Sequence, residues 1–178
     1  MKAISILQPW ASLVAIGAKK IETRSWPTNY KGPLAIHASK RFTMTNRKLC
    51  DDDTFMAALF YSSMAKITHA DQLPLGAVIA TCNLVRCLYI KDDGLFKVHG
   101  FTAGFAPDMS VEEPEKSFGD YTTGRFAWIL EDVKQIKPVP AKGQLGLWNW
   151  EPPEGVCIDG PSGSILRPGT GHSDREDA

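Results

Sequence analysis

The sequence predicts an α+β domain built on a small β-barrel of five or six strands surrounded by short helices. The chain opens with a strand, a helix and a second strand, and most of its later periodic segments are strands. It also lacks the regular strand and helix alternation of a doubly wound parallel sheet. With 178 residues, 43% of them hydrophobic, it is long enough for one domain with its own core.

The first forty residues contain the opening strand, helix and strands. Residues 3–7 are a compact apolar run that predicts a strand. Pro9 suits the first turn of a helix, and Gly17 is placed to end that helix about two turns later in a left-handed conformation. Residues 20–24 alternate in the manner of a strand, and residues 34–38 predict another.

The middle of the chain combines a helix, a long strand and a long connection. Carboxylates at residues 51–53 favour a helix N-terminus, and we expect a helix from there to about residue 65. Residues 77–90 are the longest strand signal, which predicts a bent or bulged strand shared between two sides of a barrel. Residues 95–115 show no clear period, and we interpret them as a connection with a short helix that borders a site.

The last third contains the closing strands. Residues 121–133 contain a predicted strand, residues 136–141 form a proline-limited edge or connection, and residues 142–150 close the domain with a final strand. We therefore place the domain at residues 1–152. Residues 153–178, rich in Pro, Gly, Ser and charge, are expected to form a flexible C-terminal tail.

Composition limits the classes of function. Twenty basic and twenty acidic residues give a formal net charge of zero, so binding to nucleic acid requires a local basic patch and depends on salt. No secretory signal or membrane-spanning run is visible, which predicts a cytoplasmic protein without a membrane partner. The four cysteines are scattered, and no glycine-rich phosphate loop is present, so we expect neither a metal site nor a cofactor.

Residues 8–26 carry the strongest signal for a site. Four ionisable side chains lie within six positions between two tryptophans, in the order Trp10, Lys19, Lys20, Glu22, Arg24 and Trp26. One interpretation is an ordinary ion pair of Glu22 and Arg24 that bridges a strand and a turn. The other is a charged cleft. Strand alternation places Lys20, rather than Lys19, on the same side as Glu22 and Arg24.

The pattern G-x-K-x-x-E-x-R over residues 17–24 resembles the ASCH domain family of the PUA-like superfamily. The resemblance extends over roughly residues 3–150, and further segments carry it: 8–12, 25–26, 32–38, 124–128 and 143–148. It implies a PUA-like β-barrel surrounded by short helices, with a cleft beside the barrel lined by residues 19–24. It also implies binding of RNA or other single-stranded nucleic acid.

Some bacterial members of that family are amidohydrolases that deacetylate acetylated cytidine with a Lys, a Thr and a Glu, and ribonuclease activity has been proposed for others. By its distance to Arg24, Lys19 matches the catalytic Lys, so the family spacing selects Lys19 over Lys20. The Thr position is Glu22 in this chain. The third residue, a Glu from a later segment, is not placed by any motif.

Two main hypotheses follow. The first is binding of RNA, single-stranded nucleic acid or a modified nucleobase in the cleft. The second is a metal-independent hydrolase, an amidohydrolase on acylated cytidine or a ribonuclease, in which Lys19 activates the nucleophile and Glu22 moves protons. A protein-interaction module is a weaker third. Beyond Lys19 and Glu22, the expected ligand-binding residues are Ser12, Lys20, Arg24, Trp26, Lys40, Arg41, Tyr121 and Arg125, while His37 is interpreted as a core histidine.

Overall fold

The computed structural model describes residues 1–61, 68–91, 96–97 and 110–156. The elements are, in chain order, β1 (Lys2–Ile6), α1 (Trp10–Ala15), β2 (Ile21–Arg24), β3 (Gly32–Ala38), α2 (Met44–Leu49), α3 (Asp53–Phe60), η1 (Ala70–Gln72), β4 (Ala77–Ile90), β5 (Phe96–Lys97), η2 (Glu115–Phe118), β6 (Phe126–Pro140) and β7 (Leu147–Asn149). The expected helix end near residue 65 and most of the expected tail lie outside the described residues.

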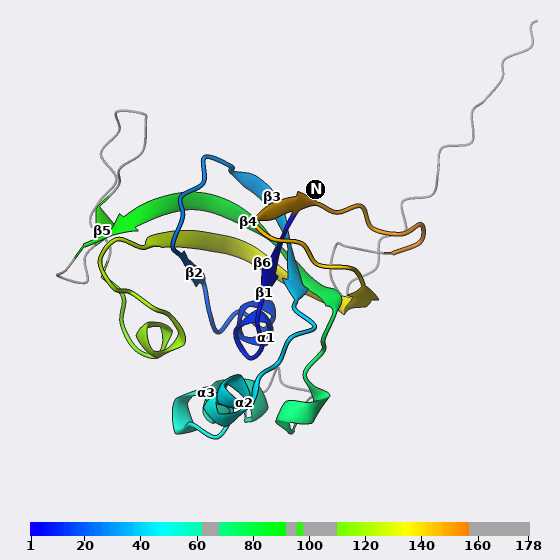
Figure 1. The fold of residues 1–178 in the computed structure, drawn as a ribbon, viewed down its shortest axis with the longest axis horizontal. Helices are drawn as coiled ribbons and strands as arrows, with labels where there is room; N and C mark the ends of the chain where they lie inside the picture. Colours follow the sequence, from blue (N-terminus) through cyan, green and yellow to red (C-terminus); the bar gives the residue numbers. More distant parts are fainter. Residues whose placement is uncertain (62–67, 92–95, 98–109, 157–178) are drawn as a thin grey trace, which may run out of the picture.

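One mixed sheet organises the molecule. Its strand order is β2-β6-β4-β3-β1-β7, with β5 paired to β4. The β1–β3 pair is parallel and the other pairs are antiparallel. The sheet curls into a half-barrel, with α1 against its concave side and α2 and α3 beyond α1 (Figure 1). This confirms the predicted α+β class and its small PUA-like barrel.

The two long strands produce the curl. Strand β4 runs for 14 residues, and its register with β6 shifts at three points, as expected for a bent and bulged strand. The sequence divided β6 into two segments, and this was wrong, because residues 126–140 form one strand. The first residues of β6 lie between β2 and β4. Among the described residues, positions 139–140 pair with β4 alone. A strand that is paired on one side only can contain proline, because its other side needs no main-chain N–H donor.

The helices begin and end on local signals. Helix α1 ends at Ala15, and Gly17 stops it from continuing with a φ of 75°, which is readily accessible only to glycine, as predicted. The Asp52 carboxylate caps α3 by accepting hydrogen bonds from Thr54 N and Phe55 N. Helix α2, whose N-cap is Thr43, was not predicted from the sequence. No helix in the described part of the chain is long and apolar enough to cross a membrane.

Apolar side chains pack on both sides of α1, and the outer side includes η2. The main core lies between the inner side of α1 and the curled sheet. The outer side of α1 forms a second cluster with α3 and η2, in which Leu13, Phe55, Leu59 and Phe118 are buried. Burying a phenylalanine contributes about 2 kcal/mol, so Phe118 is the apolar contact that fixes η2 beside α1.

Candidate functional site

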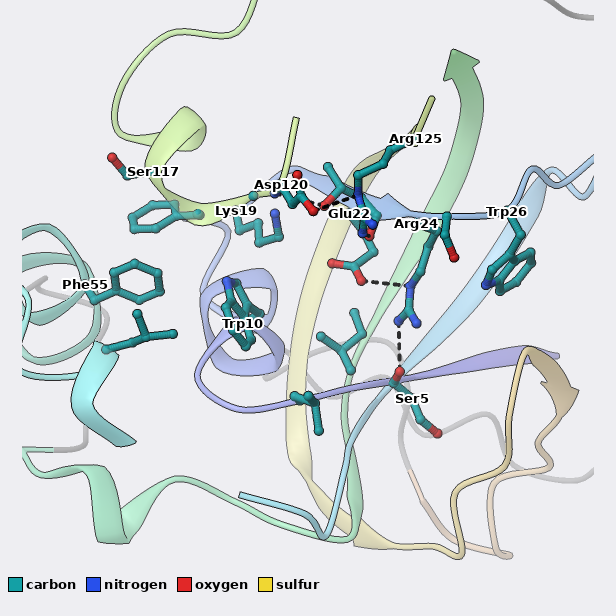
Figure 2. Close-up of a pocket in the computed structure, with 17 residues that line it drawn as sticks. Ser5, Trp10, Lys19, Glu22, Arg24, Trp26, Phe55, Ser117, Asp120 and Arg125 are labelled. Carbon is teal, nitrogen blue, oxygen red and sulfur yellow. Dashed lines mark hydrogen bonds and ion pairs between the residues drawn. The ribbon is translucent and has the colours of Figure 1, made fainter. Parts of the chain in front are cut away.

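A cavity of about 500 Å³ opens between β2, the start of α1, α3 and the segment from η2 to Arg125 (Figure 2). We call it the Lys19 cavity. The predicted residues that line it are Lys19, Glu22, Arg24, Trp26 and Arg125. The predicted residues outside its lining are Ser12, Lys20, Lys40, Arg41 and Tyr121.

The end of helix α1 directs Lys19 into the cavity. Gly17 N donates to Val14 O, and Lys19 N donates to Leu13 O at 3.0 Å, so the chain reverses over the last turn. After this reversal Lys19 is 1% exposed, whereas Lys20 points to solvent. Because β2 begins only at Ile21, the strand alternation that grouped Lys20 with Glu22 does not extend back to Lys20.

The Lys19 ammonium is buried beside two carboxylates. Its Nζ lies 3.7 Å from Glu115 Oε1 and has no hydrogen-bond partner among the described residues. Burial lowers the pKa of Lys19, and the nearby charges of Glu22 and Glu115 oppose this only in part. Lys19 therefore loses its proton more readily than an ordinary lysine, which suits a general base, and while protonated it can donate a hydrogen bond to a ligand.

Glu22 and Arg24 form one side of the cavity. Glu22 is 8% exposed, and its Oε1 lies 2.9 Å from Arg24 Nε. Arg24 Nη2 also donates to the main-chain oxygen of Ser5 at 2.9 Å (Figure 2). Strands β1 and β2 are separated by three others in the sheet, so Arg24 spans the open side of the half-barrel. Glu22 and Arg24 therefore form the ion pair of the first interpretation, and the pair also lines the cavity expected from the second.

Glu115 is a charged neighbour of Lys19 that sequence reasoning missed. Its carboxylate accepts hydrogen bonds from Lys20 N at 2.6 Å, Ile21 N at 3.3 Å and the Tyr121 hydroxyl at 3.1 Å. It comes from the end of the long connection that was expected to border a site. No sequence spacing reveals it, because the contacts with Lys20 and Ile21 cross more than ninety residues.

Arg125 lies at the mouth of the cavity. Its Nε is 3.2 Å from Asp120 Oδ2, and its Nη2 donates to Thr23 O at 3.3 Å. Asp120 N in turn donates to the Thr23 hydroxyl. These contacts tie the segment after η2 to strand β2, so the mouth is framed by the side chains of Asp120 and Arg125 (Figure 2).

Aromatic side chains line the rest of the cavity. Trp26 is half-buried and packs edge-on against Trp128, with ring centroids 4.7 Å apart. Trp10 packs edge-on against Phe55 and also lines the cavity. A cavity with aromatic and charged walls is suited to a flat polar heterocycle such as a nucleobase.

The remaining predicted residues have other roles. Ser12 was expected to donate into the cleft, but its hydroxyl instead accepts a hydrogen bond from the buried Gln8 side chain. Tyr121 binds Glu115, and Lys40 lines a separate groove. Arg41 is exposed and lines neither hollow. The described residues contain no cluster of three or more His, Cys, Asp or Glu arranged to hold a metal ion.

Comparison with known proteins identifies the family. Activating signal cointegrator 1 from Mus musculus and from Homo sapiens are each 26% identical to this chain over 147 residues, which is 82% of the chain but 21% of either relative. The chain thus spans about a fifth of the length of these curated relatives.

Solved structures of ASCH from Zymomonas mobilis, wild type and a point mutant, match with TM-scores of 0.45 and 0.46 at 15% and 16% identity. The matches cover 86% and 85% of this chain and 88% and 90% of theirs. A family model for the ASCH domain matches residues 4–140, well over half of the sequence. The chain therefore belongs to the ASCH domain family.

Proposed function

We propose that the Lys19 cavity binds a nucleobase, plain or modified, from RNA or other single-stranded nucleic acid. The observation that carries this proposal is the Lys19 Nζ, which lies on the cavity wall, buried and without a hydrogen-bond partner in the described structure. An unsatisfied buried polar group costs about 1–3 kcal/mol, and more when it is charged. A ligand atom that accepts a hydrogen bond from Lys19 recovers part of that cost.

The groups around the cavity favour particular bases. Lys19 donates a hydrogen bond, and Glu22 accepts one. Cytosine and adenine both present a ring nitrogen that accepts a hydrogen bond next to an exocyclic amine that donates one, and carboxylates pair with the cytosine amine. Trp26 and Trp10 offer aromatic surface to the base. Membership of the ASCH family is consistent with a ligand of this kind.

The test is direct binding of cytidine, adenosine and uridine, and of an eight-nucleotide oligocytidylate, measured by calorimetry or by tryptophan fluorescence. We expect Lys19→Met to weaken the binding of cytidine at least tenfold. Lys20→Met removes the same charge from the neighbouring exposed position and serves as the matched control. The proposal fails if Lys19→Met binds as tightly as the wild type, or if the wild type binds none of these ligands.

A metal-independent amidohydrolase is the second candidate, favoured by the lowered pKa of Lys19 next to Glu115. In this reaction, neutral Lys19 accepts a proton from water as the water oxygen attacks the amide carbonyl carbon of an acylated cytidine. The C–N bond then breaks as the proton taken up by Lys19 passes through the Glu22 carboxylate to the departing amine, which yields a carboxylic acid and cytidine and restores both side chains.

Chromatography of acetylated cytidine incubated with the protein tests this candidate. We expect cytidine to appear with the wild type and with Lys20→Met, and to disappear with Lys19→Met. A ribonuclease reaction is tested in parallel with single-stranded RNA. If neither substrate is consumed at protein concentrations close to that of the substrate, the protein is a binding module and the hydrolase hypothesis is wrong.

A further inference from the structure

A second hollow, of about 1080 Å³, lies where the ends of β3 and β6 meet the start of β4. We call it the Lys40–Lys142 groove. Ser5 of β1 lines both this groove and the Lys19 cavity. Its main-chain oxygen accepts the hydrogen bond from Arg24, and its hydroxyl lies 3.1 Å from His37 Nδ1. The two hollows therefore share one lining residue of β1, through its main chain on one side and its hydroxyl on the other.

The groove has a positive lining in a protein with no net charge. Two of its lining side chains are lysines, Lys40 and Lys142, and none of the described lining residues is an aspartate or glutamate. His37 also lines the groove, but burial lowers its pKa and favours the neutral imidazole. Both lysines are exposed. A local excess of basic groups without carboxylates attracts phosphates. Leu145 adds an apolar side chain at the rim, where it is 99% exposed.

The backbone that presents Lys142 is held in place. His37 is buried, and its Nε2 lies 3.1 Å from Ala141 O. The Ser5 hydroxyl donates to Gln144 O. Gly143 approaches so closely that an added Cβ would lie 2.4 Å from His37 Cε1. These contacts fix residues 141–144 against β1 and β3, which lowers the entropy lost when a ligand binds.

We propose that the Lys40–Lys142 groove binds the phosphate backbone of the same single strand whose base enters the Lys19 cavity. Lys40 and Lys142 contact phosphates of nucleotides next to the bound base, and Leu145 provides an apolar contact for a sugar or base. The strand passes over Ser5 between the two hollows. This inference rests on the proposed nucleobase binding. It further specifies that the ligand is a strand of several nucleotides and that it runs from the Lys19 cavity to the Lys40–Lys142 groove.

The experiment compares cytidine with the eight-nucleotide oligocytidylate between 50 and 200 mM salt. The test variant is Lys40→Glu with Lys142→Glu. The matched control is Lys134→Glu with Lys137→Glu, which changes the charge equally at two exposed lysines of β6 outside both hollows. Circular dichroism and thermal unfolding show whether each variant folds, and the milder pair Lys40→Gln with Lys142→Gln repeats the measurement without added negative charge.

We expect the groove variant to bind the octanucleotide at least tenfold more weakly at low salt, with cytidine binding unchanged. The slope of log affinity against log salt falls by about 1.4, because each phosphate contact to a single strand contributes about 0.7. The control keeps the wild-type slope. The neutral pair shows a smaller loss in the same direction.

Three results overturn this inference alone. The first is an equal loss in the groove and control variants, and the second is a wild type that binds cytidine and the octanucleotide equally well. Either result leaves nucleobase binding intact. The third is displacement of the octanucleotide from the groove by an equimolar acidic octapeptide, which assigns the groove to a protein partner. A wild type that binds neither cytidine nor the octanucleotide overturns the proposed function and this inference together.

Discussion

The Nζ of Lys19 lies 3.7 Å from Oε1 of Glu115, although the two residues are separated by most of the domain in sequence. Glu115 also accepts hydrogen bonds from the main-chain N–H groups of Lys20 and Ile21. The Glu115 carboxylate thus lies next to the Lys19 ammonium and also binds the main chain that follows Lys19. The segment around η2 is part of the site for this reason.

We expect Glu115→Ala to lower the free energy of unfolding by about 2 kcal/mol, because it leaves main-chain donors at Lys20 and Ile21 without their acceptor. Urea denaturation measures this change. Glu112→Ala, at an exposed position three residues earlier, is the control and is expected to change stability by less than about 0.5 kcal/mol. Equal effects of the two substitutions would show that Glu115 has no special structural role.

The lowered pKa of Lys19 predicts a pH dependence of stability. Between its folded-state pKa and the ordinary lysine value of 10.5, the unfolded chain binds more protons at this position than the folded protein. The free energy of unfolding contributed by Lys19 therefore rises with pH in this window. We expect the stability of the wild type relative to Lys19→Met to increase from pH 7 to pH 9, as measured by urea denaturation.

The measurement stops at pH 9 to limit the contribution of the buried thiols, which changes at higher pH. Burial raises the pKa of Cys50 to about 11 and that of Cys82 to about 12, from 9.0. Above pH 9 the folded protein binds more protons at these thiols than the unfolded chain, so their contribution falls as the pH rises. Lys20→Met is expected to retain the wild-type pH dependence. A flat difference between the wild type and Lys19→Met would contradict the assigned burial of the ammonium.

Arg24 is expected to couple energetically to Glu22. Arg24→Gln removes both the ion pair with Glu22 and the hydrogen bond to Ser5, and it leaves the buried Glu22 carboxylate without its 2.9 Å partner. We expect a loss of about 3 kcal/mol in unfolding free energy, as for other broken buried pairs.

A double-mutant cycle separates these effects. The double variant Glu22→Gln with Arg24→Gln is expected to lose at least about 1 kcal/mol less than the sum of the single variants, since residues in contact are not additive. Additive losses, measured by urea denaturation, would mean that the 2.9 Å contact contributes nothing to stability.

Gly143 is predicted to tolerate no side chain. In Gly143→Ala the new Cβ meets His37 Cε1 and the Ser5 hydroxyl, so the loop or the imidazole must move. Overpacking of this kind costs about 1–3 kcal/mol, which thermal unfolding detects as a lower Tm. The variant His37→Ala with Gly143→Ala removes the clashing ring and is expected to lose less than the sum of its parts. A wild-type Tm for Gly143→Ala would refute the close packing.

Local signals in the sequence were sufficient for most of the fold. The left-handed Gly17, the Asp52 cap and the long apolar run of β4 depend on chemistry within a few residues, and each appears in the structure as expected. Helix α2 was missed because it is a six-residue helix with few apolar positions. Strand β6 was predicted as two segments because its prolines indicate the end of a strand. In the structure that part of β6 pairs on one side alone, which accommodates proline.

The sequence of residues 17–24 was enough to predict Lys19, Glu22 and Arg24 as charged residues of the candidate site, because the motif that contains them is contiguous. Their partners depend on packing between distant segments. Phe118 packs against Phe55 and so brings Glu115 to the backbone after α1. The curl of the sheet brings Ser5 to Arg24. The same curl places Lys40 in a separate groove rather than at the rim of the Lys19 cavity. Hydrophobic burial and strand pairing between distant residues determine where Ser5, Lys40 and Glu115 lie, and a local sequence pattern does not contain that information.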